Sequence, residues 1–248
     1  MDDLYNKIVD GLLTVDKDGK VDVSKVQELK ESYIPKKLFK YRSCSKSHIE
    51  NFENNRLWLS FPENFNDPYD SSFSIAIASN ELEEDLLDFF FRDKIKKVMK
   101  ICCFSNSIES MLMWTHYSDE HKGFAVEYNL HQVNRIKQSL WPVFYSDKLF
   151  DFLPLLSQKP RSNLGPLVAA LHKSTDWEYE AEWRFISLDA SEDFISLPVP
   201  KAIYLGSRIC SSDEYALIKI AKHKNIKVYK MKHDRKTFKM NYELVEDK

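Results

Sequence analysis

The chain has 248 residues, of which 43% are hydrophobic and 30% charged, so it can bury a full core without disulfide bonds or metal ions. Its 36 basic and 38 acidic side chains nearly cancel, which leaves no overall positive field to attract nucleic acid. Its 5 glycines form neither G-x-G-x-x-G nor G-x-x-x-x-G-K, which argues against a Rossmann or P-loop phosphate site.

Residues 1–36 show the pattern of an N-terminal helical extension. Ile8, Leu12 and Leu13 recur at helical spacing, and a second short helix is expected from Ser24 to about residue 33, where Pro35 stops it. The segment is acidic and amphipathic, which is not the pattern of a signal peptide.

Residues 37–248 alternate between strand and helix signals and are expected to form a single domain. Strands are predicted at 37–43, 56–61, 101–105, 123–129, 142–146, 177–188 and 201–207, and helices at 46–55, 80–100, 108–120, 165–174 and 211–224. A hairpin is predicted over 227–245. Hairpin and strand–helix–strand signals together indicate an α+β fold with a mixed, largely antiparallel sheet and flanking helices.

The four cysteines predict a reducing compartment. They show no C-x-x-C spacing, and Cys102 and Cys103 lie in the apolar run "ICCFS", where free cysteine behaves as a small hydrophobic residue. The longest apolar stretch is too short to cross a bilayer. We therefore expect a cytoplasmic protein with no membrane segment.

The stretch "WEYEAEWRF" has the clearest period-two pattern in the chain. If it is a strand, Glu178, Glu180, Glu182 and Arg184 share one face. Three crowded carboxylates suit a face where one of them has a raised pKa or contacts a ligand. A solvated sheet face paired with lysines on a neighbouring strand is the alternative interpretation, and it stays open.

Two further loops carry candidate site residues. In "LSFPENFNDPYD", Asn66 and Asp67 before Pro68 predict an Asx-type turn, and Asp70 adds a carboxylate that either holds the loop or lines a pocket. In "FKYRS", Arg42 lies on an early strand, where a guanidinium could bind a phosphate or carboxylate in a bidentate manner.

The stretch "MWTHYSDEHKG" combines a helix end with pocket-like residues. His116 and His121 are about 140° apart on a helix, so they do not form a metal pair. His116 and Asp119 could share a face, with the carboxylate orienting the imidazole. Gly123 is expected as a left-handed cap that ends the helix. Trp114, His116 and Tyr117 are expected to form a pocket wall.

In this order, "KYRS", "LWLSFPENFNDPYD", "CCFS", "MWTHYSDEHKGFAVEY" and "WEYEAEWRF" resemble the bacterial family called domain of unknown function 2971. The resemblance covers about Leu38 to Gly206. It identifies a family, and it implies no established activity.

The first functional hypothesis is an NAD-consuming enzyme. The order Arg42, Ser105, Glu180-x-Glu182 is similar to the Arg, Ser, Glu series of arginine-type ADP-ribosyltransferases. That resemblance implies that Arg42 holds a phosphate or ribose and that Ser105 supports the strand near the nicotinamide. Glu182 would then stabilise an oxocarbenium-like ribose, with Glu180 steering the acceptor. Tyr117 or Trp114 would stack on the nicotinamide ring.

Two alternatives remain from the sequence. In a non-catalytic binding or regulatory module, Arg42 or Arg184 would pair with Asp67 or Asp70, and His116 with a carboxylate. A metal-dependent nuclease using Asp67, Asp70 and Glu182 is weaker, because Arg184 stands where such sites need lysine.

We predict one pocket shared by Arg42, the 66–70 loop, residues 114–117 and residues 180–184. Its expected ligand is a small molecule or nucleotide, with NAD as substrate. The sequence indicates no metal or other cofactor and no nucleic-acid signature, and it does not identify a macromolecular acceptor.

Overall fold

The computed structural model describes residues 2–75, 96–153 and 162–245. Within them the chain folds as α+β, with a mixed, mostly antiparallel eight-stranded sheet and helices around it, as the sequence predicts. The α-helices are α1 Asp2–Leu13, α2 Ser24–Glu31, α3 Lys46–Glu53, α5 Met111–Tyr117, α6 Asn134–Ser139, α8 Gly165–Ala169 and α9 Ser211–His223, and the 3₁₀ helices are η1 Pro62–Asn64 and η2 Thr175–Glu180.

The main sheet has the order β14-β13-β12-β5-β1-β4-β10-β6, and only the β12–β13 pair of these strands is parallel. Its strands are β1 Leu38–Arg42, β4 Lys100–Ser105, β5 Phe124–Tyr128, β6 Leu140–Pro142, β10 Glu182–Ser187, β12 Ala202–Leu205, β13 Lys227–His233 and β14 Met240–Leu244. The predicted C-terminal hairpin is β13–β14.

Three two-stranded pairs flank the main sheet. The antiparallel pair is β2 Arg56–Trp58 with β11 Phe194–Ser196, and the parallel pairs are β3 Phe73–Ser74 with β8 Phe150–Asp151, and β7 Phe144–Tyr145 with β9 His172–Lys173. The short β7–β9 pair matters most for function, because it ends at Lys173, directly before η2.

The centre of the main sheet opens between β1 and β4. β1 pairs with β5 along its whole length but with β4 only at Phe39↔Ser105. β4 instead pairs with β10 over six consecutive positions, from Glu182↔Ser105 to Ser187↔Lys100. Because strands alternate their side chains, Phe39, Ser105, Glu182 and Arg184 project from one face of the sheet.

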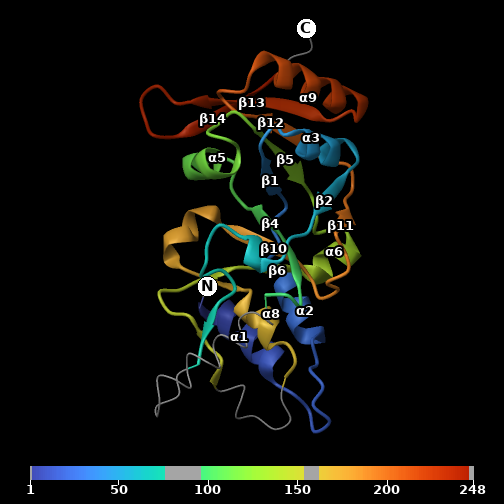
Figure 1. The fold of residues 1–248 in the computed structure, drawn as a ribbon, viewed down its shortest axis with the longest axis vertical. Helices are drawn as coiled ribbons and strands as arrows, with labels where there is room; N and C mark the ends of the chain where they lie inside the picture. The colour runs from blue at the N-terminus through green and yellow to red at the C-terminus, as the bar shows by residue number, and fades with distance from the viewer. Residues whose placement is uncertain (1, 76–95, 154–161, 246–248) are drawn as a thin grey trace.

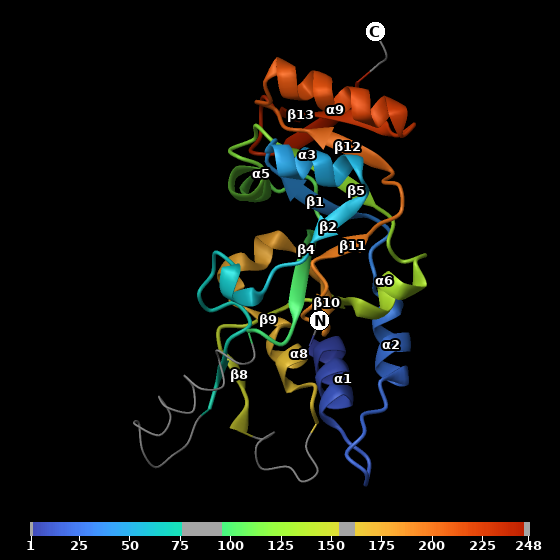
Figure 2. The ribbon, with the colours of Figure 1, turned by 45° about the vertical axis from the view of Figure 1, so that its right-hand side comes forward.

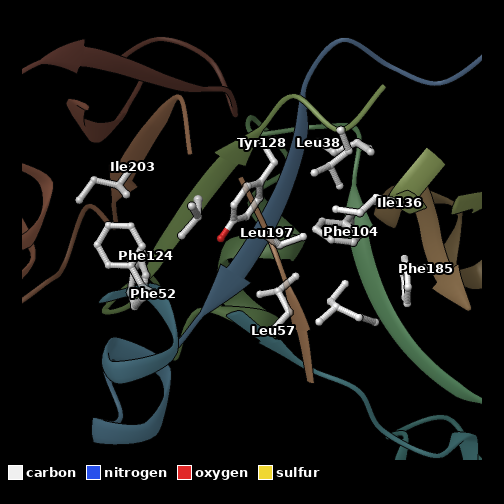
Figure 3. Packing of buried hydrophobic residues seen from close by; sticks show 14 of the residues in the cluster. Leu38, Phe52, Leu57, Phe104, Phe124, Tyr128, Ile136, Phe185, Leu197 and Ile203 are labelled. Atoms are coloured by element: carbon white, nitrogen blue, oxygen red, sulfur yellow. The ribbon is translucent and has the colours of Figure 1, made fainter. Parts of the chain in front are cut away.

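The opposite face of the sheet carries the largest buried cluster. Figure 3 shows Leu38, Phe104, Phe124, Tyr128 and Phe185 of the strands packed with residues from outside the main sheet. Phe52 of α3, Leu57 of β2, Ile136 of α6 and Leu197 after β11 cover them. The largest apolar cluster therefore lies on one face of the central strands, and Glu182 and Arg184 lie on the other.

The N-terminal helices pack against the lower end of the molecule (Figures 1 and 2). Leu4, Ile8 and Leu12, spaced four apart on α1, join a buried cluster with Val168 and Phe144. Ser24 is the first residue of α2, but its side chain does not cap the helix, since Val23 is the N-cap residue.

Several of the predicted elements differ in the structure. The predicted strand 177–188 begins only at Glu182, because Ser174 caps a 3₁₀ turn over Thr175–Glu180 and Ala181 takes a left-handed conformation (φ 44°). The helix predicted over 108–120 is confined to Met111–Tyr117. Most of the helix predicted at 80–100 lies outside the described residues, and Lys100 begins β4.

No helix in the described part of the chain combines the length and the apolar character that crossing a membrane requires.

Candidate functional site

A pocket of about 350 Å³ lies where β1 and β4 diverge. Its walls come from segments far apart in the sequence, namely β1, the loop after η1, β4, α5 and the β9–η2–β10 connection. The lining residues are Phe39, Lys40, Tyr41, Asn64, Phe65, Asn66, Asp70, Cys103, Phe104, Ser105, Met113, His116, Tyr117, Lys173, Glu180 and Glu182. A volume of this size is that of an ordinary small-molecule site, and the mixture of aromatic and charged groups is typical of one.

The backbone around Glu180 is held by β4. Ser105 Oγ donates a hydrogen bond of 2.6 Å to the Glu180 carbonyl oxygen, and Ser105 also pairs with Glu182 in the sheet register. Between the two glutamates, Ala181 lies in the left-handed region. This turn lets Glu180, at the end of a 3₁₀ helix, and Glu182, at the start of a strand, line the same pocket.

Glu180 is buried between two donors. The Tyr117 hydroxyl donates to Oε1 and the Lys173 ammonium donates to Oε2. Burial, followed by the negative charge of Glu182, raises the pKa of Glu180 to about 7. Burial and the neighbouring Glu180 charge likewise raise the pKa of Tyr117. A carboxyl group of this kind can take up and release a proton near neutral pH.

Glu182 is buried as well, but its surroundings shift its pKa in the opposite direction. Arg184 Nε donates to Oε1 at 2.9 Å, and Oε2 accepts from Arg184 Nη2 at 3.1 Å and from Lys173 Nζ at 3.0 Å. Burial alone would raise the pKa of Glu182, but the charges of Arg184 and Lys173 outweigh it and hold the pKa below its usual value. Glu182 therefore stays ionised over the pH range in which Glu180 takes up and releases a proton.

Arg184 and Asp70 form the floor beneath the two glutamates. Arg184 is fully buried and donates to both oxygens of Asp70, from Nη1 at 2.8 Å and from Nη2 at 2.6 Å. Its Nη1 also donates to the Ala170 carbonyl at 2.8 Å. The bidentate pair holds the 66–70 loop against β10. Arg184, which the sequence predicts to bind substrate, does not line the pocket in the structure but lies beneath it.

Lys173 links all three buried carboxylates. Its Nζ contacts Glu180, lies 3.0 Å from Glu182 and lies 3.8 Å from Asp70. Burial lowers the pKa of this lysine, but the charges of Glu182, Glu180 and Asp70 outweigh that effect and leave it raised. The cluster thus contains three acids and two bases, and it stays one negative charge in excess while Glu180 is ionised.

The mouth of the pocket carries polar groups that are exposed to solvent. His116 is exposed, and its Nδ1 lies 2.9 Å from the Tyr179 hydroxyl. Asn66 Nδ2 donates to the Tyr117 hydroxyl at 3.4 Å. The predicted pairing of His116 with Asp119 is not present, because α5 ends at Tyr117 and Asp119 lies beyond it with a φ of 49°.

Trp114 does not form the pocket wall that the sequence predicts. It is fully buried, its Nε1 donates to the Ile108 carbonyl at 2.7 Å, and it packs edge-on against Tyr41. Residues 114 and 117 are three apart on α5, which is only two turns long. The helix inserts the Trp114 side chain beneath β1. Trp114 supports the pocket from behind and cannot stack on a ligand there.

Asp67 and Arg42 also lie outside the pocket. Asp67 makes the predicted Asx turn, with Oδ1 accepting from Tyr69 N at 2.9 Å, and it lines a separate hollow with Tyr69 and Asp176. Arg42 is opposite Phe124 in the sheet register, so its side chain leaves the face of the sheet opposite to Glu182. Arg42 instead lines a hollow that adjoins the pocket.

The described residues do not support the nuclease hypothesis. They contain no group of three or more His, Cys, Asp or Glu side chains that could hold a metal ion. Of the three acids proposed for that role, Asp67 lies away from the pocket, while Asp70 and Glu182 are bound by Arg184. The positively charged side chains bound to these carboxylates occupy the oxygens that would have to coordinate a metal ion.

Sequence reasoning missed Lys173, the residue on which the cluster centres. A signal was present, since Lys173 follows the apolar run "LVAAL" after a single residue, His172, and precedes a capping serine. We expected residues 165–174 to form one helix, whereas α8 ends at Ala169 and residues 172–173 form β9. The lysine therefore points inward from a strand.

Comparisons with known proteins place the chain only at the level of a family. Searches of the curated proteins and of the solved structures each returned no match. A family model matches residues 113–185, a narrower span than the resemblance in the sequence, and the match contains Tyr117, Lys173, Glu180 and Glu182. The model is that of the family described as "Protein of unknown function (DUF2971)", and this match over residues 113–185 supports the resemblance that the sequence shows.

Proposed function

We propose that the protein is an NAD-consuming, ADP-ribosyltransferase-like enzyme whose reacting centre is the pocket around Glu180 and Glu182. One observation carries the proposal. Two carboxylates in the same pocket have pKa values displaced in opposite directions, Glu180 upward and Glu182 downward. Such a pair separates the two tasks of glycosyl transfer, proton movement and stabilisation of positive charge.

The chemistry follows from these two environments. The glycosidic bond between ribose C1′ and the nicotinamide nitrogen breaks, and its electron pair leaves with nicotinamide. The ionised Glu182 stabilises the positive charge that develops on the ribose. An acceptor hydroxyl or water then attacks C1′, and its proton passes to Glu180, which can accept it near neutral pH. Water as acceptor yields nicotinamide, ADP-ribose and a proton.

The other lining residues support these steps. Lys173 and Arg184 hold Glu182 ionised, and Ser105 fixes the backbone of Glu180. The Tyr117 hydroxyl can rotate to accept from Glu180 once that carboxyl is protonated, since at present it donates to it. Phe39 and Phe65 supply apolar wall for a ring such as nicotinamide.

The test is release of nicotinamide from NAD, measured by chromatography for the wild type and two variants. We expect Glu180→Gln to lower the rate by at least about 100-fold, because general acid–base catalysis contributes about that much. Glu178→Gln is the matched control. It lies on the same 3₁₀ turn, but its side chain is exposed and does not line the pocket. No release by the wild type with water, protein or nucleotide acceptors would refute the proposal.

A non-catalytic binding or regulatory module is the second candidate, and the completeness of the ion cluster favours it. Both oxygens of Glu180, Glu182 and Asp70 accept hydrogen bonds, so the cluster is already satisfied without a ligand. If this candidate is correct, the wild type has no turnover that a variant could change. Glu180→Gln would then change only the melting temperature. Because Glu180→Gln is expected to alter stability in either case, the presence or absence of nicotinamide release separates the two candidates.

A further inference from the structure

The two edges of the main sheet differ in how far they are closed. At one edge, all three residues of β6 are buried, the strand ends in proline, and the Leu140 carbonyl accepts from Lys30 Nζ at 2.7 Å. The other edge is β14, which lies at the end of the molecule opposite the N-terminal helices (Figure 1). Four of its five residues are exposed. An open edge strand can pair with a strand of another chain, so proteins usually block such an edge.

The backbone groups on the outer side of β14 are free to pair. Asp234 N donates to the Lys239 carbonyl at 2.9 Å, and Val245 N donates to the Val228 carbonyl at 2.9 Å. Because backbone groups alternate sides along a strand, the odd-numbered residues of β14 point their N–H and C=O groups toward β13. The even-numbered residues point theirs outward, where no strand in the described part of the chain pairs with them. These residues are Met240, Tyr242 and Leu244.

β14 also lacks the features that usually protect an edge. It contains no proline, and it pairs with β13 at five consecutive positions without a bulge. Its one charged side chain, Glu243, forms an ion pair with Lys232 of β13. The turn before the strand is ordered, because Asp234 Oδ1 accepts from the backbone N–H groups of Lys236 and Thr237 at 2.8 and 2.7 Å. The hairpin is therefore held in the extended form that strand pairing requires.

The sequence of this edge is complementary to itself in one register. Two copies related by a two-fold axis place their β14 strands antiparallel, with outward-pointing residues opposite one another. With the axis at Asn241, Met240 lies opposite Tyr242 of the second copy, and Lys239 lies opposite Glu243 of the second copy. The symmetry produces each contact twice, so the pairing gains two pairs of opposite charges. Lys239 is exposed and makes no ion pair with another described residue.

The neighbouring registers lack this complementarity. An axis at Met240 places Lys239 opposite Asn241, and an axis at Tyr242 places Glu243 opposite Asn241, so neither forms a charge pair. An axis at Glu243 places the two Glu243 carboxylates opposite each other, which is destabilising. The charges therefore select the register centred on Asn241.

The other face of the same edge exposes apolar side chains. Tyr242 is 39% exposed and Leu244 is 54% exposed, and Phe238, just before the strand, is 96% exposed. In the register centred on Asn241, Phe238 lies nearest to Leu244 of the second copy. Strand pairing would thus cover apolar surface that a single chain leaves in water.

We propose that the β14 edge is a self-association site, at which two copies of the chain pair their β14 strands about Asn241. The two eight-stranded sheets then form one continuous sheet. Both open edges are used in this contact, so the assembly closes at the dimer. One pair of short strands buries less surface than a standard interface, so we expect a dissociation constant in the micromolar range. No residue of this edge lines the pocket, so the dimer does not depend on the proposed function.

The test is sedimentation velocity of the full chain at about 1–300 μM, a range that spans such a constant. The wild type should shift from monomer to dimer as its concentration rises. Lys239→Glu and Glu243→Lys each place like charges opposite one another twice, so each should raise the dissociation constant by at least about tenfold. Both positions are exposed, and circular dichroism checks that each variant folds.

Mixing the two variants separates a specific contact from a general effect of charge. In a one-to-one mixture the Lys239→Glu copy carries acids at both positions and the Glu243→Lys copy carries bases, so the heterodimer regains two complementary contacts and should form as readily as the wild-type dimer. The matched control is Lys219→Glu, which makes the same charge change at an exposed position of α9. It should alter the dissociation constant by less than about twofold.

Association that is lost in both charge variants and regained in their mixture would support the proposal. A wild type that stays monomeric at about 300 μM would overturn it and would leave the edge to a strand of another protein. Charge variants that associate like the wild type, or a mixture that does not recover association, would overturn it as well. Species larger than a dimer would show that the contact is not the closed two-fold pairing.

Discussion

At the scale of single residues, the site depends on how differently two glutamates two positions apart are treated. Both are buried, and both contact Lys173. Glu182 alone also receives two hydrogen bonds from Arg184, and this guanidinium decides which of the two carries the negative charge. Without Arg184 the two carboxyl groups would compete for one cation, since like charges at close range cannot both ionise cheaply.

This asymmetry predicts a pH dependence of stability. The pKa of Glu180 is about 7 in the folded protein against 4.5 for an ordinary glutamate, so the folded state binds more protons between these pH values. Stability should therefore fall as pH rises from about 4.5 to 7, by a total on the order of 3 kcal/mol. Glu182 acts oppositely but below this window, because its pKa is lowered.

Urea unfolding at several pH values between 4 and 8 checks this prediction. In Glu180→Gln the free energy of unfolding should lose this decline relative to the wild type, whereas in Glu178→Gln it should keep it. A wild-type minus Glu180→Gln difference that does not change across the window would show that Glu180 titrates as an ordinary carboxyl group.

At the scale of elements, the turn after α5 depends on a close approach between backbone segments at Gly123, which only glycine permits. Asp119, Glu120 and His121 all have positive φ, and they form the left-handed turn that we assigned to Gly123. Gly123 itself does not lie in the left-handed region. A Cβ there would overlap the Arg42 carbonyl oxygen and lie 2.9 Å from that of Ser118.

We therefore expect Gly123→Ala to lower the free energy of unfolding by about 2–3 kcal/mol, because backbone atoms cannot move away as a side chain can. The comparison is Gly11→Ala in α1, where the added Cβ would lie 2.3 Å from Val26 Cγ2, so that a side chain and not the backbone has to shift, and where alanine gains helix propensity. The midpoints of urea unfolding measure the effects of both substitutions, provided that the m-value is unchanged. Equal effects of the two substitutions would refute the steric argument.

The η2 turn brings together the glutamates that the sequence predicts to lie together, but it does so as a 3₁₀ turn and not as the continuous strand that the sequence predicts. Strand alternation predicted that Glu180, Glu182 and Arg184 share a face. Only Glu182 and Arg184 do so on β10, and Glu180 joins them because Ala181 reverses the backbone. A period-two pattern cannot distinguish these cases, since a left-handed residue at alanine has no strong sequence signal.

At the scale of the whole molecule, the N-terminal helices are integrated with the rest of the fold. Lys30 of α2 is fully buried, and its Nζ donates to the carbonyls of Lys137, Gln138 and Leu140 at 2.7–2.8 Å. It also lies 4.0 Å from the centre of the Trp141 ring. An ammonium at the C-terminal end of α6 satisfies carbonyls that the helix leaves free.

Lys30→Met should lower the free energy of unfolding by roughly 3 kcal/mol, because it leaves these buried carbonyls without donors. Unfolding should remain a single transition by circular dichroism and tryptophan fluorescence, since α2 belongs to the same cooperative unit. Lys25→Met, on the exposed side of α2, should change it by less than about 0.5 kcal/mol. Two separate transitions in the Lys30 variant would show that the N-terminal section folds independently.

The sequence by itself determined what depends on neighbours along the chain. Hydrophobic periodicity predicted α1, β1, β4, β5, β12, α9 and the final hairpin, because burial of one face imposes a repeat that is visible locally. The Asx turn at Asp67 was predicted for the same local reason. The motif series was sufficient to predict the family.

Only the tertiary structure decided which charged side chains meet. Lys173 reaches Glu180, Glu182 and Asp70 from a two-residue strand that has no periodicity of its own. Arg42 and Glu182 lie on opposite faces of the sheet because their register is set by pairing with β5 and β4, which the sequence does not encode locally. Contacts between distant segments depend on how strands pair, and strand pairing is a property of the folded chain.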